Sequence, residues 1–511
     1  MTATTDAEQA PDSRSVRRFS VPRLTFPQLW VALAILLPVL AALIASLSAV
    51  DLAYHVRAGD LILDSGSVLR SDPFAFTTGG GTWLDQQWGA QVLLALGYRA
   101  GGWVLLAVIR AVLVAVVIGL TFVACRRSGA GLRVAAWLAL AAFILAAAAM
   151  GLRPQLFGMV LFAATLALLA GRKRRPRAVW LIPLLVIPWA SLHGSFIFAP
   201  AAVGIAWLED VLAGRPDARR LFAVAVASAV ATLVNPFGPG VWSYAIGLTA
   251  NPTIRRLITE WQPTAPFSAS GLLLYGSMLI FAVLVARRLR ATGPGTWRST
   301  LRAALPTLAW LVFLGVVAAA AERGIAWWAL AAPVAVARLL GPAGAAGPTD
   351  GVQPDAPRRR EPASTLNGAI VIVLLVAGVA LLPSWRAGGS AGPAGLLSDA
   401  PTGITTALAG KVGPSDRIWN AQRWGSWLEF ALPGVPVAVD SRIEVIPTAA
   451  WDDHLALSSG AADWQAILDR WGVTVVVASR EEQAALIPLL TASPAWTRAY
   501  QDADGVVFVK R

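Results

Sequence analysis

Residues 29–50 have the sequence LWVALAILLPVLAALIASLSAV, an apolar run that ends directly before the acid Asp51. A helix of about 20 apolar residues spans the roughly 30 Å hydrocarbon core of a bilayer. The run is too long for a signal peptide and lacks a small-residue cleavage site, so we expect a retained membrane anchor. Asp51 is then the point where the chain leaves the membrane and enters a polar segment, residues 51–88.

Similar apolar runs recur along the 511-residue chain, which is 56% hydrophobic and only 14% charged. Soluble domains are about 25% charged, so this composition predicts an α-helical polytopic membrane protein. The pattern favours about eleven transmembrane helices of the required length. They are expected at 29–49, 102–125, 131–150, 154–171, 178–193, 195–213, 221–235, 269–286, 302–320, 324–341 and 367–384.

Positive charge is concentrated in alternate loops between these runs. With the N-terminus inside, dense Arg and Lys runs fall in cytoplasmic loops, as the positive-inside rule requires. These loops are 126–133, 171–177, 214–220, 287–302 and 358–362. The net charge of +13 therefore orients the protein in a membrane and does not indicate a nucleic-acid partner. An odd number of spans places the C-terminal region outside.

Three regions differ in composition. Residues 1–20 are polar and basic and predict a disordered cytoplasmic tail. Residues 21–385 contain the apolar runs, with a first outer loop at 51–100. Residues 386–511 are expected to form a separate extracytoplasmic domain.

The C-terminal region combines strand and helix patterns. Short β-branched runs at 435–440, 472–479 and 505–511 alternate with helical patterns, which predicts a small α/β domain. We expect Asp440 and Arg442 near its surface, where they either form a salt bridge or recognise an acceptor.

The first outer loop holds the strongest candidates for chemistry. Asp51 and His55 are four residues apart, so a helix places them on one face. A carboxylate beside an imidazole at the membrane boundary suits general-base catalysis on a lipid-linked substrate. Asp72, in a turn of the same loop, is a candidate for substrate binding. A divalent metal held by these three residues is an alternative, and Asp51 as a merely solvated boundary acid is another.

Basic residues in other predicted outer loops are candidates for binding a phosphate. Arg153 lies between two spans, where a guanidinium can bind a phosphate through paired hydrogen bonds; snorkelling to lipid headgroups is the alternative. His193 either lines the site or caps a helix. Arg323 either pairs with Glu322 or reaches a phosphate.

The long loop 235–263 is too apolar for a solvated loop and too interrupted by proline for a span. We expect short interfacial helices over the outer mouth of the bundle. Arg255 and Arg256 are phosphate candidates there, and Trp261 is placed to stack on a sugar face. Contact with lipid headgroups is the alternative for all three.

Several segments resemble one known family. They are DLAYHVRAGDLILDSGSVLRSDPFAFTTGGGTWLDQQW (51–88), RPQLFG (153–158), LHGSF (192–196), VNPFG (234–238), RIWNAQRWGSWLEFALPGVPVAVDSRIEV (417–445) and AWTRAYQDADGVVFVKR (495–511). Together they resemble bacterial membrane proteins of the GT-C glycosyltransferase superfamily. Members of that superfamily are polytopic enzymes that use polyprenyl-phosphate sugars, and their catalytic acid lies in the first extracytoplasmic loop.

The resemblance implies inverting transfer of a hexose or pentose from a polyprenyl-phosphate donor, outside the bacterial plasma membrane. The acceptor would be a cell-envelope glycan, lipid or protein. Asp51 would be the base, and His55 would orient the base or the acceptor. Arg153, Arg255, Arg256 or Arg323 would stabilise the leaving phosphate. No cofactor is certain, although a divalent metal remains open.

One departure from the family pattern concerns the acid itself. Many members carry two adjacent acids in this loop, whereas Leu52 follows Asp51. A second acid, Asp60 or Asp72, would have to be brought close by the fold.

A non-catalytic membrane protein is the rival prediction, either a transporter or a scaffold for envelope lipid or polysaccharide assembly. A transporter should carry paired ionisable residues at mid-bilayer and internal repeats. Arg110 is the one ionisable residue that the pattern places deep inside a span, and no repeat is evident.

Overall fold

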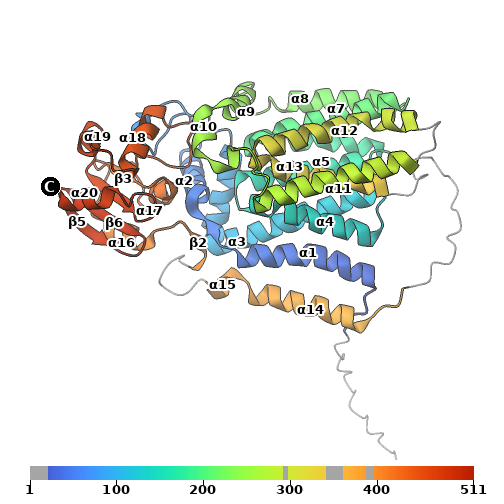
Figure 1. Ribbon diagram of the computed structural model, residues 1–511, viewed down its shortest axis with the longest axis horizontal. Helices are drawn as coiled ribbons and strands as arrows, with labels where there is room; N and C mark the ends of the chain where they lie inside the picture. The colour runs from blue at the N-terminus through green and yellow to red at the C-terminus, as the bar shows by residue number, and fades with distance from the viewer. Residues whose placement is uncertain (1–20, 292–296, 341–360, 387–394) are drawn as a thin grey trace, which may run out of the picture.

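The computed structural model describes residues 21–291, 297–340, 361–386 and 395–511. A long bundle of helices carries a smaller α/β domain at one end (Figure 1). The predicted disordered tail, residues 1–20, lies outside the described residues. The extents proposed for the two larger regions, 21–385 and 386–511, stay predictions.

Each predicted apolar run lies over a helix of the bundle. The helices are α1 (Phe26–Ile44), α3 (Trp88–Arg127), α4 (Leu132–Ala146), α5 (Pro154–Ala170), α6 (Leu181–Leu192), α7 (Phe198–Leu212), α8 (Ala218–Ala231), α11 (Ala269–Ala291), α12 (Trp297–Ala320), α13 (Ile325–Leu340) and α14 (Thr365–Ala380). Among the described residues, six helices are long and apolar enough to cross a membrane, and four more apolar helices are shorter. The number of spans therefore stays a prediction.

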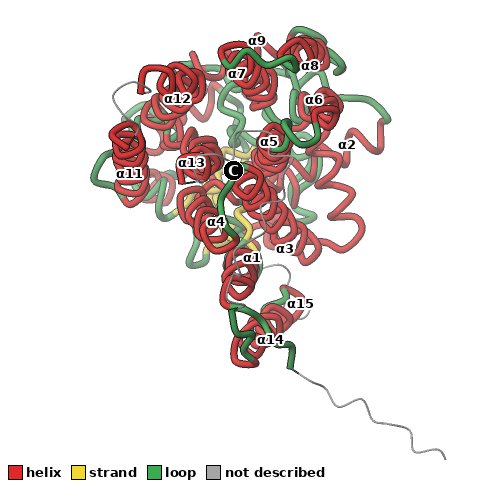
Figure 2. Tube along the Cα trace, turned by 90° about the vertical axis from the view of Figure 1, so that its right-hand side faces the viewer, coloured by secondary structure: helices red, strands yellow, loops and turns green. Residues whose placement is uncertain are grey.

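The interior of the bundle is built around α13. Seen along the helices, α13 lies among α4, α5, α11 and α12, while α1 and α14 lie together at one edge (Figure 2). Nearly all of α13 is buried, from Ile325 to Ala337. A helix that is apolar on all sides is expected in such a core position.

The helix α3 is longer than the predicted span because two helices join at a kink. Gly102 has φ 60° and ψ −156°, a conformation that is almost restricted to glycine. The predicted span at 102–125 corresponds to the part after the kink. The part before it, from Trp88, continues the first outer loop.

The α/β domain contains a four-stranded mixed sheet. Its strands are β3 (Ile418–Asn420), β4 (Val475–Ser479), β5 (Trp496–Gln501) and β6 (Gly505–Lys510), in the order β3-β4-β6-β5. β3 and β4 are parallel, and the other two pairs are antiparallel. The helices are α16 (Thr402–Leu408), α17 (Gly425–Ala431), α18 (Thr448–Ser458), α19 (Trp464–Arg470) and α20 (Leu486–Ala492). The predicted α/β architecture is confirmed.

One predicted strand is absent. The run 435–440 is not a strand, and only Val437 forms bridges, one to Ile418 and one to Ala75. Pro436 explains part of this, because proline cannot donate to a sheet ladder. The backbone of Val437 bonds in both directions with the first outer loop, from Phe76 N (3.0 Å) and to Phe74 O (3.1 Å). The edge of the sheet is therefore completed by the first outer loop.

The first outer loop contains the predicted helix, α2 (Ala49–Ser65). Most of its residues are buried, because it packs against both α3 and α17. Directly before it, β1 (Leu47–Ser48) pairs in parallel with β2 (Leu397–Ser398). The helix that carries Asp51 is thus held between the bundle and the α/β domain, as Figure 1 shows.

The prediction that Asp440 and Arg442 lie near the surface is wrong. Arg442 is 1% exposed and Asp440 is 0% exposed. The guanidinium lies 5.5, 4.9 and 4.7 Å from the ring centroids of Tyr54, Phe74 and Trp83. These rings come from the first outer loop. The residues next to Arg442 in the sequence therefore give no indication that aromatic side chains will cover it.

The alternative of a salt bridge is confirmed. Arg442 binds Asp440 through its Nε (3.0 Å) and Asp72 through its Nη1 (2.7 Å). Asp72 also accepts from Phe74 N (3.1 Å) and from Thr78 Oγ1 (2.9 Å). A buried charge keeps its countercharge and hydrogen bonds, since an unpaired one is very costly. This ion cluster of Arg442, Asp440 and Asp72 joins the α/β domain to the first outer loop.

Candidate functional site

Asp51 lies in the first turn of α2, where the helix N-terminus favours a negative charge. Its Oδ2 pairs with Arg153 Nε at 2.9 Å, and the side chain remains 25% exposed. Burial acts to raise the pKa of Asp51, but Arg153 and a hydrogen bond from Ser441 hold it below its ordinary value. Asp51 is therefore ionised at neutral pH, with an acceptor oxygen at the end of the bundle.

Arg153 is placed by the start of α5. It is the residue before Pro154, in an extended conformation that proline imposes on its predecessor. Its guanidinium reaches Asp51 on one side and Glu260 on the other, the latter through Nη1 at 2.7 Å. The two carboxylates raise the pKa of Arg153, with Asp51 contributing most. Arg153, the residue predicted to bind a phosphate, is thus a cation held between two carboxylates.

His55 lies one helical turn after Asp51, as predicted, and is 2% exposed. Burial lowers its pKa to about 3, against the opposite pull of Asp51. The imidazole is therefore neutral at physiological pH. Its Nδ1 has no hydrogen-bond partner within the described part of the chain. The neutral imidazole therefore keeps one buried nitrogen that is available for a hydrogen bond with a neighbouring group.

Arg323 and Trp261 lie against each other, with the guanidinium 5.5 Å from the ring centroid. Arg323 belongs to the short turn Glu322–Gly324 between α12 and α13, and Trp261 to the turn Thr259–Trp261. The positive charge of Arg323 acts on Asp51, His55 and His193. The structure therefore brings this second cation toward the same site.

His193 has the capping role that was the alternative to lining the site. It precedes the turn Gly194–Ile197, and its Nδ1 accepts from Ser195 N at 3.1 Å. Ser195 Oγ is 2.8 Å from the same nitrogen and accepts from Trp189 Nε1. These bonds fix the turn between α6 and α7.

The remaining predicted residues are not gathered around Asp51. Asp72 is occupied by the ion cluster described above. Arg256, on α10 (Pro252–Leu257), binds Asp452 on α18 at 2.8 Å and so contacts the α/β domain. Arg255 is exposed on the same short helix. Asp51, His55 and Asp72 do not form a metal site, since the described residues contain no group of three or more His, Cys, Asp or Glu that could hold one.

Asp60 is not a second acid at this site. It lies two turns further along α2 and pairs with Arg99 at 2.6 Å, as does Asp64. The intramembrane Arg110 is also accounted for, because it donates to backbone carbonyls at the end of α1, among them Ser46 O at 2.6 Å.

Several residues of the site were not predicted. Glu260 reaches the site through Arg153, and Ser441 through its hydrogen bond to Asp51; Tyr244 donates to Glu444 at 2.8 Å. Asp85 is 2% exposed, and burial raises its pKa to about 8. Its Oδ1 accepts from Gln91 Nε2 at 2.7 Å. The sequence held two signals for these residues: Glu260 precedes Trp261, and Asp85, Ser441 and Glu444 lie inside two of the segments that carry the family resemblance.

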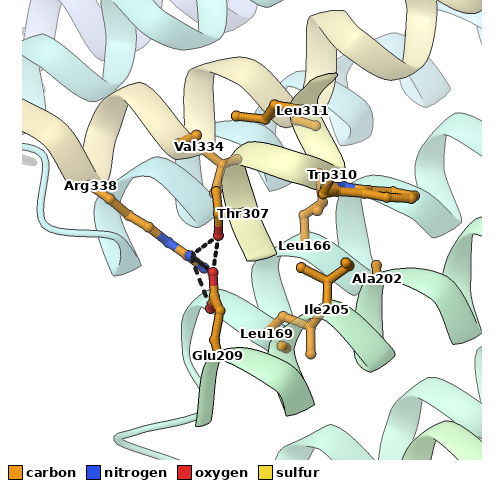
Figure 3. Close-up of a pocket in the computed structure, with 13 residues that line it drawn as sticks. Leu166, Leu169, Ala202, Ile205, Glu209, Thr307, Trp310, Leu311, Val334 and Arg338 are labelled. Atoms are coloured by element: carbon orange, nitrogen blue, oxygen red, sulfur yellow. Dashed lines mark hydrogen bonds and ion pairs between the residues drawn. The ribbon is translucent and has the colours of Figure 1, made fainter. Parts of the chain in front are cut away.

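Two apolar grooves run along the bundle near this end. One, of about 750 Å³, lies between the start of α3, the end of α6 and residues 233–236. The other, of about 580 Å³, continues between α6 and α8, and Ile187 lines both. A further pocket at the opposite end, lined by Glu209, Thr307 and Arg338, is only about 50 Å³ (Figure 3). That volume holds a few waters at most, so we assign it no substrate.

Comparison with solved structures identifies the fold. The oligosaccharyltransferase of Archaeoglobus fulgidus, tethered with an acceptor peptide, superposes with a TM-score of 0.54 at 12% identity, covering 95% of this chain and 74% of that one. The same protein, AglB, in complex with an inhibitory peptide and dolichol-phosphate gives 0.55 at 12% identity, covering 95% and 75%. ArnT from Cupriavidus metallidurans bound to undecaprenyl phosphate gives 0.49 at 16% identity, covering 94% and 97%.

The chain has the fold of the two oligosaccharyltransferase structures: a polytopic helical bundle followed by a C-terminal domain. No protein-family model matches the chain, and no curated protein matches it. At this level of identity the likeness concerns the fold and leaves the activity to be argued from the site.

Proposed function

We propose that the protein is a membrane glycosyltransferase that moves a sugar from a polyprenyl-phosphate donor to a cell-envelope acceptor. The observation that carries the proposal is the ion pair of Asp51 and Arg153. The two side chains lie 2.9 Å apart, and Asp51 follows soon after the first apolar helix, which supports the roles of base for Asp51 and phosphate-binding cation for Arg153. The solved structures with the same fold include one with dolichol-phosphate, which supports a lipid-linked donor.

The reaction is an inverting displacement. Asp51 accepts the proton of an acceptor hydroxyl while the hydroxyl oxygen attacks the anomeric carbon of the donor sugar. The bond between that carbon and the phosphate oxygen breaks, and polyprenyl phosphate leaves with the electron pair. Arg153 and Arg323 stabilise the charge that develops on the phosphate. His55, being neutral, orients the acceptor or Asp51 by a hydrogen bond.

The lipid chain of the donor is proposed to lie in the apolar groove between α3, α6 and residues 233–236. The first outer loop is tied to the helix that borders this groove, because Gln86 donates to Ala190 O near the end of α6 at 2.7 Å. Binding its phosphate at Arg153 draws the guanidinium away from a carboxylate. We propose that Glu260 is the one released, since it is more exposed than Asp51, at 39% against 25%.

Location and orientation belong to the same proposal. We propose that the protein lies in a bacterial plasma membrane with its N-terminus in the cytoplasm and the α/β domain outside. The alternation of basic loops supports this orientation. A transporter or scaffold gains no support from Arg110, whose contacts with the end of α1 are structural.

The decisive experiment is sugar transfer by purified variants with a polyprenyl-phosphate sugar. Asp51→Asn keeps the hydrogen bond to Arg153 but removes the base, so kcat should fall by about 10²–10⁴. Arg153→Ala should also raise the donor KM, because a phosphate contact exists before the transition state.

Asp64→Asn is the matched control. Asp64 lies on the same helix, and its ion pair with Arg99 is exposed, so the change should leave both kcat and KM near wild type. Wild-type transfer by Asp51→Asn would remove Asp51 from the mechanism, whereas absence of transfer by the wild type itself would favour a non-catalytic protein.

A further inference from the structure

A polar pocket of about 390 Å³ lies on the α/β domain, outside the site built around Asp51. It is placed at the carboxyl ends of the parallel strands β3 and β4. Arg423 and Trp424 follow β3, and Ser479 to Glu481 end β4. Residues 399–401 and the turn between β5 and β6 complete the wall. Ligands of open α/β sheets bind in this crevice, and the volume is within the range of small-molecule sites, roughly 300–1,000 Å³.

The pocket is built from charged groups that hold one another in place. Arg423 pairs with Asp399 at 2.8 Å and with Glu481. Arg480 is fixed by a bond from its Nε to Asp502 O at 2.9 Å. Arg423 remains 32% exposed and Glu481 77% exposed. Rigid carboxylate and guanidinium groups that solvent reaches can form paired hydrogen bonds with neighbouring hydroxyls.

Asp399 has an unusual backbone conformation, with φ 62°. A residue other than glycine in the left-handed region is uncommon and must be held there by its surroundings. Here the pairing of β1 with β2 ends one residue before it, and Ser48 Oγ donates to its carboxylate at 3.2 Å. Such conformations cluster at functional sites. In this pocket the effect is to present the carboxylate to Arg423.

The pocket and the Asp51 site lie on either side of the same elements. Ser48, which holds Asp399, directly precedes α2, whose first turn contains Asp51. On the other side, Arg423 precedes α17; Ser426 on α17 is 3.2 Å from Ser441, and Ser441 donates to Asp51. The pocket is therefore linked to the proposed base through two packed elements, the start of α2 and α17.

We infer that this pocket binds the carbohydrate part of the acceptor and positions one of its hydroxyls for Asp51. The role of the bound molecule as acceptor rests on the proposed function, whereas the binding of carbohydrate rests on the pocket alone. The mixture of donors and acceptors suits a polyhydroxylated ligand, whereas the two grooves along α6 are apolar. The wall carries Asp399, Glu481 and Asp504 against Arg423 and Arg480, so a neutral or amino sugar fits better than an acidic one.

The test measures binding to the full chain in detergent by fluorescence polarisation. The probes are labelled maltotriose and labelled chitotriose, with labelled oligogalacturonate as the acidic comparison. At least one of the first two should bind, and the acidic probe should bind at least 10-fold more weakly. Arg423→Gln should weaken binding by 10-fold or more.

Asp399→Gly is the second variant, because glycine keeps the left-handed backbone without strain. It should still fold, because relief of the backbone strain offsets part of the lost bonds to Arg423 and Ser48, and it should lose 10-fold or more in binding. Asp469→Asn, on the exposed pair with Lys510 of the same domain, should bind like wild type. No saturable binding by either favoured probe, or binding that neither pocket variant weakens, would overturn the inference.

Further results separate this inference from the proposed function. Asp51→Asn should bind the probe normally while losing sugar transfer. Binding in the pocket and catalysis at Asp51 can therefore be lost independently. In transfer assays Asp399→Gly should raise the KM of the acceptor and leave that of the donor unchanged. A raised donor KM, or displacement of the probe by the lipid-linked sugar, would assign the pocket to the donor and overturn the acceptor role. Displacement of the probe by a peptide that carries no sugar would overturn the assignment of the pocket to carbohydrate.

Discussion

Replacing Arg442 by methionine tests how strongly the α/β domain is joined to α2. Arg442→Met keeps an unbranched stem but removes the guanidinium. The side chains of Asp72 and Asp440, both 0% exposed, would then be buried without a countercharge. Removing one partner of a buried ion pair costs about 3–5 kcal/mol. The lost contacts with three rings add about 0.5–2 kcal/mol.

Glu429 does not add a third charge to this sum. It lies 3.7 Å from Arg442 and is 1% exposed. Burial raises its pKa well above the ordinary value, and the neighbouring Asp440 raises it further. It is therefore protonated. The expected loss is about 5 kcal/mol, against a total stability of roughly 5–15 kcal/mol for a folded domain.

The assay is thermal unfolding of the purified full chain at pH 7, with limited proteolysis of the α/β domain as a second readout. A loss of this size corresponds to a Tm lower by about 10–20 °C at 2–4 °C per kcal/mol. The double variant Arg442→Met/Asp440→Asn should recover part of the loss, because it removes one of the two orphaned charges.

The stability lost in Arg442→Met should depend on pH. In the wild type, burial acts to raise the pKa of Asp440, but Arg442 holds it below its ordinary value. Its contribution is therefore present above the unfolded pKa of about 3.9 and is lost below it. Without Arg442, burial favours protonation, so the deficit of the variant should shrink as the pH falls toward 5. A Tm within 2 °C of wild type at pH 7, or a deficit that grows in acid, would refute the reasoning.

Two other predictions concern Asp85 and the orientation of the chain. Burial raises the pKa of Asp85 to about 8, so its contribution to stability is present below the unfolded value of about 3.9 and is lost as the pH rises through about 8. Asp85→Asn should therefore flatten the fall of Tm between pH 5 and 9; parallel curves would contradict this. A cysteine at Ser398 should react with an impermeant maleimide in intact cells, and one at Lys173 should not. The single native Cys125 is 0% exposed and should stay silent, and the reverse labelling pattern would invert the orientation.

The helices of the bundle could be predicted from the sequence because their signal is local. The length of an apolar run and the charges that flank it decide whether a segment can cross a bilayer. The extent of α3 could not be predicted in this way. Gly101 and Gly102 suggest a break between two helices, and both have non-helical dihedral angles in the structure; the helix before the break, from Trp88, lies outside the predicted span.

The candidate site could be predicted only in part. Asp51 and His55 share a face of α2 because a spacing of four residues determines it. The partners of Arg153 could not be foreseen, since Glu260 is 107 residues away along the chain. The burial of Arg442 was missed for the same reason, because Asp72 is 370 residues distant. Pairs of this kind depend on the tertiary fold and leave no periodic pattern.

The position of Asp51 depends on both ends of the chain. The start of α2 is held by the pairing of β1 with β2, and the rest of the first outer loop by Val437 and Arg442. Deleting the α/β domain would remove all of these contacts together with the polar pocket. Loss of transfer after such a deletion would follow equally from a displaced base and from a lost acceptor, so it could not distinguish them. Asp399→Gly can distinguish these two causes. It removes one carboxylate of the pocket, while the backbone pairing of β1 with β2 and the ion cluster of Arg442 remain.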